Sequence, residues 1–501
     1  MKAGSHSVSA LSLAGLQALP KGVSRPTYSR AALSAGIVHF GPGNFHRAHQ
    51  GVFLDALMNT GRALDWAVIG ASVMPGDEGL RQTLLAQDLL TTVVSQSAVH
   101  SEARVTGPMV DYLPVADTEA ILATLVDPRI RIVSLTVTEG GYFIDADTGR
   151  FDVSHELIQH DLANPDSPRT VFGLIVKALA KRELGGLRGF TVLSCDTLPH
   201  NGSVARAAVL GMAERIAPAL LDWIKANVSF PCGMVDRIAP ATGPRERELI
   251  QSTFGVADQA PVFCEDYLQW VLEDKFVAGR PALESVGVQF VDDVAPYETM
   301  KIRILNGGHA LIAYAAALLD IEFGSEAIAH PWVGAFMAKV EREEILPVVP
   351  AVPGVELPSY LTLIQTRFAN PKIGDTVRRL CFDGSNRQPK FIVPTIRDQI
   401  AAGGSLNGLA LACALWCRYC YGQTDSGVTI EANDPSWPHL KAMAAQAREN
   451  PGLWLGMREV YGDLGDDQRF SERFDHWLRT VWQLGTAQAL RQYLQNQVGD
   501  W

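Results

Sequence analysis

The sequence predicts an α/β fold, with a doubly wound parallel sheet in the N-terminal part followed by a largely α-helical domain. Through residues 1–295, apolar strand-like runs alternate with segments of helical periodicity, the pattern of parallel strands joined by crossover helices. From residue 296 onward, helical periods separated by Pro/Gly turns replace this alternation. Because 501 residues exceed what one hydrophobic core usually supports, we place two domains at 1–295 and 296–501.

The elements of the first domain follow in order along the chain. Strands are expected at "GIVHF", "WAVIGASV", "RIRIVSLTVTEGG" and "GFTVLSCD", which are short apolar or β-branched runs bounded by turn residues. Helices are expected at 44–59 and 169–184, where the apolar residues recur with a helical period. In the second domain, "PWVGAFMAKVEREEIL" and "LNGLALACALWCRYCYG" carry the same period.

Composition and charge exclude several classes of protein. The 43 basic and 54 acidic residues give a net charge of −11, which provides no field for holding a phosphate backbone, so no nucleic-acid partner is expected. The longest apolar windows, such as 310–319, are shorter than the about 20 residues that cross a bilayer, and no secretory signal is recognisable. We expect a cytoplasmic protein without a membrane partner, and both a monomer and a small homo-oligomer remain open.

Three cysteines, Cys413, Cys417 and Cys420, have a C-x3-C-x2-C spacing that resembles the cluster site of iron–sulfur radical enzymes. That site needs a loop that wraps three thiolates around the cluster. Here the cysteines fall at i, i+4 and i+7 of an Ala/Leu-rich segment, which favours the apolar stripe of a buried helix. An iron–sulfur enzyme is kept as a remote alternative.

The stretch "HFGPGNFHRAHQ", His39 to Gln50, is typical of the start of a dinucleotide-binding turn. Gly41 permits a tight turn out of the preceding strand, and Gly43 lets a pyrophosphate approach the backbone at a helix N-terminus. The third glycine of the pattern is absent, and His46 stands in its place. We expect an altered helix-to-strand contact there without loss of phosphate binding, and the motif alone also fits an ordinary turn.

A second stretch, "YETMKIRILNGGHALIAY", carries Lys301, Asn306 and His309 on an expected helix. At about 100° per residue, Asn306 lies about 140° and His309 about 80° from Lys301, so all three share one side. The adjacent Gly307 and Gly308 cost a helix interior about 2 kcal/mol relative to alanine, which is tolerated most easily where something approaches the backbone closely.

This set of side chains suits the oxidation of a secondary alcohol by hydride transfer, which needs a base for the hydroxyl proton and a donor for the oxygen. Lys301 serves as the base if burial among apolar neighbours and a positive nicotinamide lower its pKa toward neutrality. Asn306 would supply the oxygen-directed N–H, and His309 would orient the substrate or the lysine. A surface lysine beside a core His and Asn fits the spacing equally well.

These stretches belong to a larger set that resembles the polyol-specific long-chain dehydrogenases, the mannitol dehydrogenase family. From about residue 30 to about residue 400 the set comprises "GIVHFGPGNFHRAHQ", "VSLTVTEGGY", "LSCDTLPHNG", "FPCGMVDRIAP", "KIRILNGGH" and "CFDGSNRQPKFIVPT". The resemblance implies a Rossmann-type dinucleotide-binding domain, a helical substrate and catalytic domain, and an active site between them. The implied reaction is metal-independent interconversion of a polyol and a ketose with NAD, with D-mannitol to D-fructose expected.

The same resemblance implies roles for individual residues. Lys301 is the catalytic base, and Asn306 and His309 match the residues that polarise the oxygen and position the substrate. Glu298, one helical turn before Lys301, is predicted to carry the proton onward to water. An ordinary surface helix carboxylate is the other interpretation of Glu298.

Substrate contacts are implied at Asp236 and Arg379, which match positions that bind the polyol hydroxyls. Arg387 stands where a lysine is familiar, which keeps the charge and changes the hydrogen-bond geometry. The family usually reads "SCDN" where this chain has Thr197, so a hydroxyl replaces a second asparagine against the reacting oxygen. Asn201 is a nearby candidate to take over that contact.

The expected cofactor-binding residues are Gly41, Gly43, Asn44, Phe45, His46, Arg47, Glu139 and Asp77. An acidic residue after the second strand binds the ribose 2′-hydroxyl in such folds, whereas basic residues accommodate a 2′-phosphate. Asp77 and Glu78 follow "WAVIGASV" somewhat late, and no basic cluster follows directly. NAD is therefore favoured and NADP stays open.

Two alternatives within the same family remain. An arabinitol- or sorbitol-type dehydrogenase would share all of these motifs. A fructuronate reductase-like enzyme would share the glycine loop and Lys301. Arg379 and Arg387 would then bind the substrate carboxylate.

Overall fold

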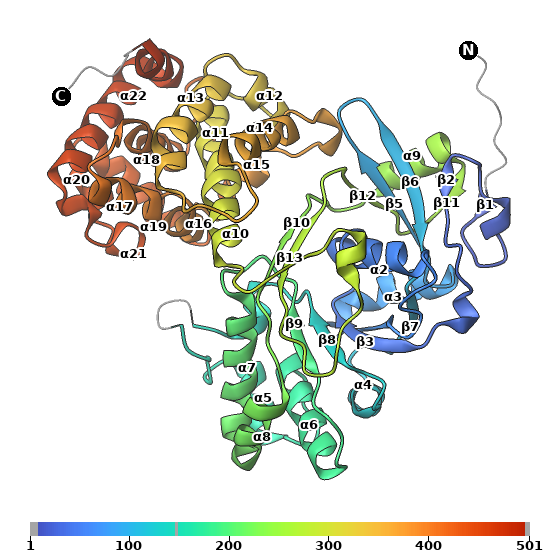
Figure 1. Ribbon diagram of the computed structural model, residues 1–501. Helices are drawn as coiled ribbons and strands as arrows, with labels where there is room; N and C mark the ends of the chain where they lie inside the picture. The colour runs from blue at the N-terminus through green and yellow to red at the C-terminus, as the bar shows by residue number, and fades with distance from the viewer. Residues whose placement is uncertain (1–8, 146–148, 496–501) are drawn as a thin grey trace. The chain divides into compact units, whose positions relative to one another are not determined.

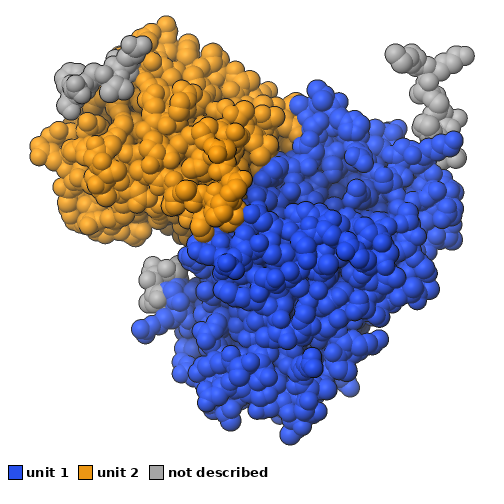
Figure 2. Space-filling model, viewed as in Figure 1, with its two compact units in different colours: residues 1–295 blue, residues 296–501 orange. Residues whose placement is uncertain are grey.

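The computed structural model describes residues 9–145 and 149–495 (Figure 1). The chain forms two compact units, Met1–Ala295 and Pro296–Trp501 (Figure 2).

Unit 1 is built on a five-stranded sheet in which every pair of neighbours is parallel. The strand order is β7-β4-β3-β8-β9. The strands are β3 (Ala35–Phe40), β4 (Ala67–Ala71), β7 (Met109–Tyr112), β8 (Ile132–Leu135) and β9 (Thr191–Ser194). The four strands expected from the sequence are all present in this sheet, and the predicted α/β class is confirmed.

Apolar side chains cover both faces of this sheet, as a doubly wound fold requires. Val38 and Phe40 of β3 point to one face, where they pack with buried side chains of α4, α6 and α7. Ile37 points to the other face and packs with side chains of α2 and β13. The alternation along β3 therefore divides unit 1 into two hydrophobic layers.

The helices of unit 1 differ from the expected ones chiefly in one break. The predicted helix 44–59 is split at His49, whose backbone lies at φ −118° and ψ −87°. The predicted helix 169–184 begins at Val171, because the Thr170 side chain accepts the N–H of Gly173 and caps it.

The α-helices are α1 (Asn44–Ala48), α2 (Gln50–Met58), α3 (Glu78–Ala86), α4 (Thr118–Val126), α5 (Glu156–Ala163), α6 (Val171–Leu184), α7 (Asn201–Ile216), α8 (Leu221–Asn227) and α9 (Pro244–Phe254). Single 3₁₀ turns lie at η1 (Leu16–Ala18), η2 (Arg30–Ala32), η3 (Pro75–Asp77), η4 (Glu139–Tyr142), η5 (Pro218–Leu220) and η6 (Leu283–Val286).

Three smaller sheets in unit 1 were not predicted. They have the orders β12-β5-β6-β2, β10-β13-β14 and β1-β11, and they include antiparallel pairs. Their strands are β1 (Ser9–Ala10), β2 (Val23–Ser24), β5 (Thr91–Gln96), β6 (Ser101–Thr106), β10 (Gly233–Asp236), β11 (Val256–Ala257), β12 (Val262–Glu265), β13 (Gln269–Glu273) and β14 (Gln289–Val291). Most are short and mix polar with apolar residues, so hydrophobic runs alone do not reveal them.

Among the described residues of unit 2, the regular secondary structure is helical apart from isolated β-bridges. Its α-helices are α10 (Ala295–Met300), α11 (Gly307–Leu318), α12 (Gly324–Ala329), α13 (Val333–Val340), α14 (Leu357–Phe368), α15 (Val377–Leu380), α16 (Gly384–Phe391), α17 (Val393–Ala402), α18 (Asn407–Cys420), α19 (Trp437–Ala447), α20 (Gly452–Leu455), α21 (Arg458–Tyr461) and α22 (Gln468–Gln495). Three 3₁₀ turns lie at η9 (Leu346–Val348), η10 (Pro371–Ile373) and η11 (Leu464–Asp466). No helix of the described chain is long and apolar enough to span a bilayer.

The central helix of unit 2 is α18, which packs against α11 and α22. Cys413, Cys417 and Cys420 lie within it and are fully buried, as the apolar-stripe interpretation predicts. Burial raises the pKa of all three thiols, which disfavours the thiolates that cluster ligation requires.

Two segments of unit 2 are π-helical, η7 (Lys301–Asn306) and η8 (Glu341–Ile345), and they pack against each other. A π-helix has i→i+5 hydrogen bonds, so its turns take more residues than those of an α-helix. The expected α-helical angles between Lys301, Asn306 and His309 are therefore wrong. Such segments are rare and frequently occur at functional sites.

Candidate active site

A cleft of about 790 Å³ opens in unit 1 at the carboxyl ends of β3, β4 and β8. Its volume lies in the range of pockets that hold cofactors and small ligands. The sheet order places β4 and β8 on opposite sides of β3, so the cleft lies at the point where the strand order reverses, the usual ligand position in open α/β sheets. The lining includes Gly41, Gly43, Asp77, Thr136 and Arg169.

The turn after β3 shows two different uses of glycine. Gly41 has φ +83°, and an added Cβ would lie 2.3 Å from the carbonyl oxygen of Thr136, so both conformation and space require glycine. Gly43 has φ −72°, which any residue adopts, and the nearest atom to an added Cβ is 3.9 Å away. A side chain at residue 43 would therefore fit the fold and project into open space beside the cleft.

The polar side chains of α1 anchor this turn within unit 1. Arg47 is buried and donates to the carbonyl of Ala260 at 2.5 Å and to Oδ1 of Asn44 at 2.8 Å. Asn44 Nδ2 donates to the Pro240 carbonyl at 3.0 Å. Burial lowers the pKa of Arg47 to about 10, which leaves the guanidinium charged at neutral pH.

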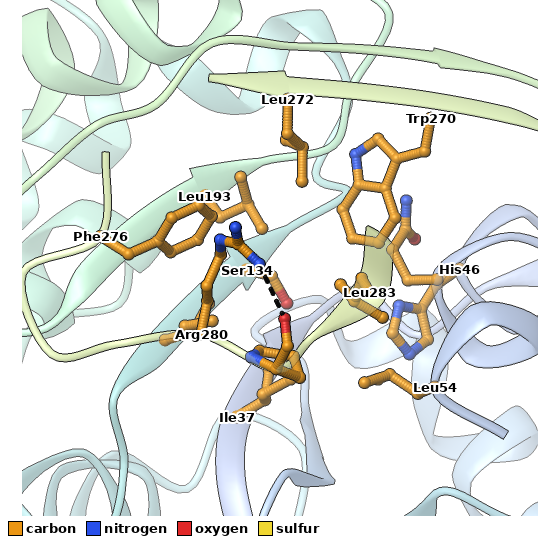
Figure 3. A pocket seen from close by; sticks show the side chains of 13 residues that line it. Ile37, His46, Leu54, Ser134, Leu193, Trp270, Leu272, Phe276, Arg280 and Leu283 are labelled. Carbon is orange, nitrogen blue, oxygen red and sulfur yellow. Dashed lines mark hydrogen bonds between the residues drawn. The ribbon is translucent and has the colours of Figure 1, made fainter. Parts of the chain in front are cut away.

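His46 stands where the pattern has its third glycine. Its side chain lies beside His39, on the face of the sheet away from the cleft. Its ring stacks on that of His39 with centroids 3.5 Å apart, and burial lowers its pKa to about 3. It lines a separate cavity of about 20 Å³ in which Figure 3 shows His46 and Trp270 on one side and Phe276 and Arg280 on the other. Because this cavity has room for one water molecule only, the cofactor candidate is the larger cleft.

In unit 2, Lys301 is the first residue of η7 and only 7% exposed. Its neighbours Met300 and Ile304 are fully buried, and Glu298 in α10 is 6% exposed. The burial expected for a catalytic lysine is thus present, and the surface interpretations of Lys301 and Glu298 are wrong. Asn306 ends the π-helix, and its Oδ1 is buried without a hydrogen bond to any described residue.

His309 lies flat against Phe368, with ring centroids 4.0 Å apart and planes at 14°. Burial lowers the pKa of His309 to about 3, Asp375 acts in the opposite sense, and nearby Arg379 and Arg387 lower it further. The imidazole is therefore neutral at weakly acidic and at higher pH, with one ring nitrogen as a hydrogen-bond donor and the other as an acceptor. Arg379 is held in a bidentate ion pair by Asp375.

A carboxyl group lies close to Gly308, the second glycine of the pair after η7. An added Cβ at Gly308 would lie 2.6 Å from Oε1 of Glu341. Glu341 is fully buried, and neither of its carboxyl oxygens has a hydrogen-bond partner among the described residues. What approaches the backbone of Gly308 is thus a side chain of the same unit.

Two family profiles match the chain in succession. The mannitol dehydrogenase Rossmann domain matches residues 35–285, and the mannitol dehydrogenase C-terminal domain matches residues 293–482. The chain belongs to the mannitol dehydrogenase family.

Individual relatives agree along the whole chain. A mannitol 2-dehydrogenase of Cereibacter sphaeroides is 56% identical over 477 residues, which cover 95% of this chain and 100% of the relative. The ternary complex of Pseudomonas fluorescens mannitol 2-dehydrogenase with NAD and D-mannitol superposes with a TM-score of 0.87 at 41% identity, covering 97% of this chain and 100% of the other. A substrate-free D-sorbitol dehydrogenase superposes with a TM-score of 0.88 at 35% identity and covers 96% and 100%. The predicted family is confirmed.

Not every residue expected to bind the cofactor faces the cleft. Gly41, Gly43 and Asp77 line it, and Asp77 remains the acidic candidate because Glu78 is paired with Arg81 at 3.0 Å. The lining does not include Asn44, Phe45, His46, Arg47 or Glu139. Asn44, Phe45, His46 and Arg47 belong to α1, which follows the turn. Glu139 is exposed in η4 next to the lining residue Thr138.

The expected substrate residues of unit 1 have different surroundings. Asp236 ends β10 and is 4% exposed, whereas Thr197 is exposed in the loop after β9. Asn201 is fully buried, and its amide donates to the carbonyls of Ser194, Asp196 and Gly233 and accepts the N–H of Gly233. Both N–H hydrogens of this amide are thus used by backbone carbonyls, and the expectation that Asn201 replaces the missing asparagine as a donor to the reacting oxygen is wrong.

Asp196 is an organising residue that the sequence analysis missed. Its carboxylate accepts the N–H groups of Val137 and Thr138, each at 3.0 Å, and the hydroxyl of Tyr142 at 2.7 Å. Thr138 has φ +65°, an uncommon conformation for a residue with a side chain. Asp196 therefore holds a strained part of the cleft wall. An acidic residue at the end of β9, beside the loop after β8, is the signal that predicts this role.

Proposed function

We propose that this protein is an NAD-dependent, metal-independent polyol dehydrogenase that oxidises D-mannitol to D-fructose. The observation that carries the proposal is the full-length match to mannitol 2-dehydrogenases, combined with a buried lysine at the start of a π-helix. Among the described residues, no group of three or more His, Cys, Asp or Glu side chains could hold a metal ion. A protein base is thus the chemically consistent alternative to a metal-bound hydroxide.

The residues of unit 1 fit a dinucleotide. The cleft has the required size, Gly43 leaves its wall open, and Asp77 offers a carboxylate to a ribose hydroxyl. NAD, when bound, accepts the hydride from the carbinol carbon. The carboxylate of Asp77 favours NAD. NADP would instead need a basic side chain for its 2′-phosphate, and Arg169 is the basic residue in the lining of the cleft.

The residues of unit 2 move the proton and hold the oxygen. Lys301 accepts the hydroxyl proton, and Glu298, which is also buried, passes it toward water. The amide of Asn306 donates a hydrogen bond to the oxygen as it becomes negative. Neutral His309, held flat by Phe368, orients the reacting hydroxyl.

The remaining hydroxyls of the polyol are bound by Asp236, Arg379 and Arg387. Arg379 is oriented by its bidentate pair with Asp375, and a fixed guanidinium suits vicinal oxygens. Thr197, where the family usually has an asparagine, offers one hydroxyl in place of an amide. We place the substrate preference within the family at Thr197 and Arg387.

A substrate panel tests the function. D-Mannitol, D-arabinitol and D-sorbitol are oxidised with NAD or NADP, and D-fructose and D-fructuronate are reduced with the reduced cofactors, each before and after prolonged EDTA treatment. We expect the highest kcat/KM for D-mannitol with NAD and no effect of chelation. A preference for fructuronate or NADP, or activity lost to EDTA and restored by zinc, would overturn the corresponding part of the proposal.

Replacing Gly43 by valine is expected to raise the Kd for NAD by at least tenfold without unfolding the protein. The conformation of Gly43 and the 3.9 Å of free space accept a side chain, but valine occupies the space that the pyrophosphate needs. The measurement is fluorescence titration with NAD beside the thermal midpoint of the free protein. An unchanged Kd in a folded variant would show that this turn does not face the cofactor.

A further inference from the structure

Two buried side chains, His39 and Ser134, and the partly buried Thr136 form a hydrogen-bonded chain from the interior of unit 1 to the glycine turn. His39 in β3 is fully buried, with Nδ1 2.7 Å from Oγ of Ser134 and Nε2 2.8 Å from Oγ1 of Thr136. Thr136 Oγ1 in turn donates to the carbonyl oxygen of Gly41 at 2.6 Å. The chain therefore connects Ser134, inside β8, with the first residue of the turn.

The direction of each hydrogen bond in this chain is determined. Thr136 has one hydroxyl hydrogen and gives it to Gly41, so its oxygen must accept from Nε2–H of His39. A neutral His39 that carries its hydrogen on Nε2 must accept at Nδ1, and Ser134 is the donor there. Each of the three side chains thus donates its single hydrogen toward Gly41.

The surroundings of His39 keep it neutral. Burial lowers its pKa well below the usual range, and the stacked His46 acts in the same sense. A proton added to His39 would place donors at both ring nitrogens and would force Ser134 to turn its hydrogen away. The neutral Nε2–H tautomer is thus the form that this chain of bonds accommodates.

The position of Thr136 links the chain to the cleft. Thr136 lines the cleft, whereas Ser134 lines the small cavity of Figure 3 with His46 on the other face of the sheet. The Gly41 carbonyl also accepts the N–H of Gly43 at 2.7 Å, so the same oxygen is bound both by the turn and by the relay. Rotating this peptide would move Gly43, which borders the cleft.

We propose that Ser134, His39 and Thr136 form a positioning relay that fixes the Gly41 peptide and thereby sets the affinity of the cleft for the dinucleotide. The relay rests on the proposed function only for the identity of that ligand. None of the three residues is a catalytic residue, because they act through the backbone of the turn.

The experiment compares Thr136→Val with Thr136→Ser. Valine has nearly the shape of threonine but leaves His39 Nε2–H and the Gly41 carbonyl without their shared partner, whereas serine keeps the hydroxyl. We expect Thr136→Val to raise the Kd and KM for NAD about tenfold, with a smaller change in kcat, and Thr136→Ser to restore values within about twofold of wild type. Thr124→Val is the matched control, because its hydroxyl bonds the Ala120 carbonyl within α4 and neither of these two residues lines the cleft.

A second measurement does not depend on the cofactor. In protein labelled with ¹⁵N at histidine, two-bond couplings should show His39 with its hydrogen on Nε2 at neutral pH, the signal being assigned by its loss in His39→Gln. If Thr136→Val fails to fold, Ser134→Ala, which removes the far end of the relay, should raise the Kd for NAD about threefold. The relay is overturned by an Nδ1–H tautomer, by an unchanged Kd in Thr136→Val, or by a serine variant as weak as the valine variant. Wild-type protein that does not bind NAD would overturn the proposed function, and the tautomer would then decide on the relay alone.

Discussion

Lys301→Ala is expected to lose at least three powers of ten in kcat/KM for polyol oxidation while it still binds NAD. General-base catalysis is worth about 10² to 10⁴-fold, and the lost ammonium group also disturbs placement of the substrate. Lys301 is 7% exposed and its neighbours Met300 and Ile304 are fully buried, so its amine is largely shielded from bulk solvent. The measurement is steady-state kinetics with D-mannitol beside a fluorescence titration with NAD.

The pH profile distinguishes a base from a structural lysine. Oxidation by wild type should rise with pH as Lys301 loses its proton, and this dependence should disappear in the alanine variant. A small added amine should restore part of the rate, because the vacated space accepts a base of similar chemistry. Lys441→Ala, at an exposed position of α19 in the same unit, is the matched control and should behave as wild type. An alanine variant with near-normal rates, or with the wild-type pH profile, would remove Lys301 from the mechanism and leave His309 as the next candidate.

The sequence predicts the parallel sheet well because its strands are continuous apolar runs buried on both faces. Val38 and Phe40 face one layer and Ile37 the other, so almost every residue of β3 is apolar and the run is conspicuous. The antiparallel pair β5 and β6 has the sequences "TTVVSQ" and "SEARVT". Such strands owe their stability to cross-strand pairing, and the partner of a strand is not visible in a local pattern.

In the candidate site, too, sequence motifs predict some features, whereas features that involve residues far apart in the chain are not predicted. The motifs predict which residues carry the chemistry, because Lys301, Asn306 and His309 lie close together in the sequence. They do not reveal the π-helix η7, which packs against η8 and changes the angles between these side chains. Nor do they reveal that the space left by Gly308 is taken by Glu341, 33 residues further along the chain.

Asn201 shows how proximity in sequence misleads. It lies four residues after Thr197 and has the right functional group for the missing contact. The structure uses its amide to join β9 to β10 through Gly233, and an amide whose N–H hydrogens already bond the backbone has none left to donate to a substrate oxygen. Motif spacing identifies a chemical group, whereas only the fold shows whether the group is already engaged.

Replacing Glu341 is expected to change the stability of the protein rather than its catalytic rate. Its carboxyl is fully buried, and both oxygens lack hydrogen-bond partners among the described residues. Burial raises the pKa of Glu341 well above the ordinary value of 4.5, because a charge without a partner is costly in such an environment. Between these two pKa values the folded protein keeps a proton that the unfolded chain releases. Folding therefore becomes less favourable as pH rises through that interval.

Glu341→Gln is accordingly expected to stabilise the protein, and the gain should grow with pH. The amide has nearly the shape of the protonated carboxyl and has no charge to lose, so the mutant lacks the pH-dependent penalty. Each pH unit above 4.5 adds about 1.4 kcal/mol to the difference, or about 3 to 6 °C in Tm for a domain of this size, until the pKa of the folded state is reached. Thermal unfolding of both proteins at pH 5, 6, 7 and 8 measures this slope, and Glu343→Gln, at an exposed residue of the same π-helix, should show none. Parallel Tm curves for Glu341→Gln and wild type would mean that Glu341 finds a partner for its charge, and the carboxyl against Gly308 would then be ionised in the folded protein.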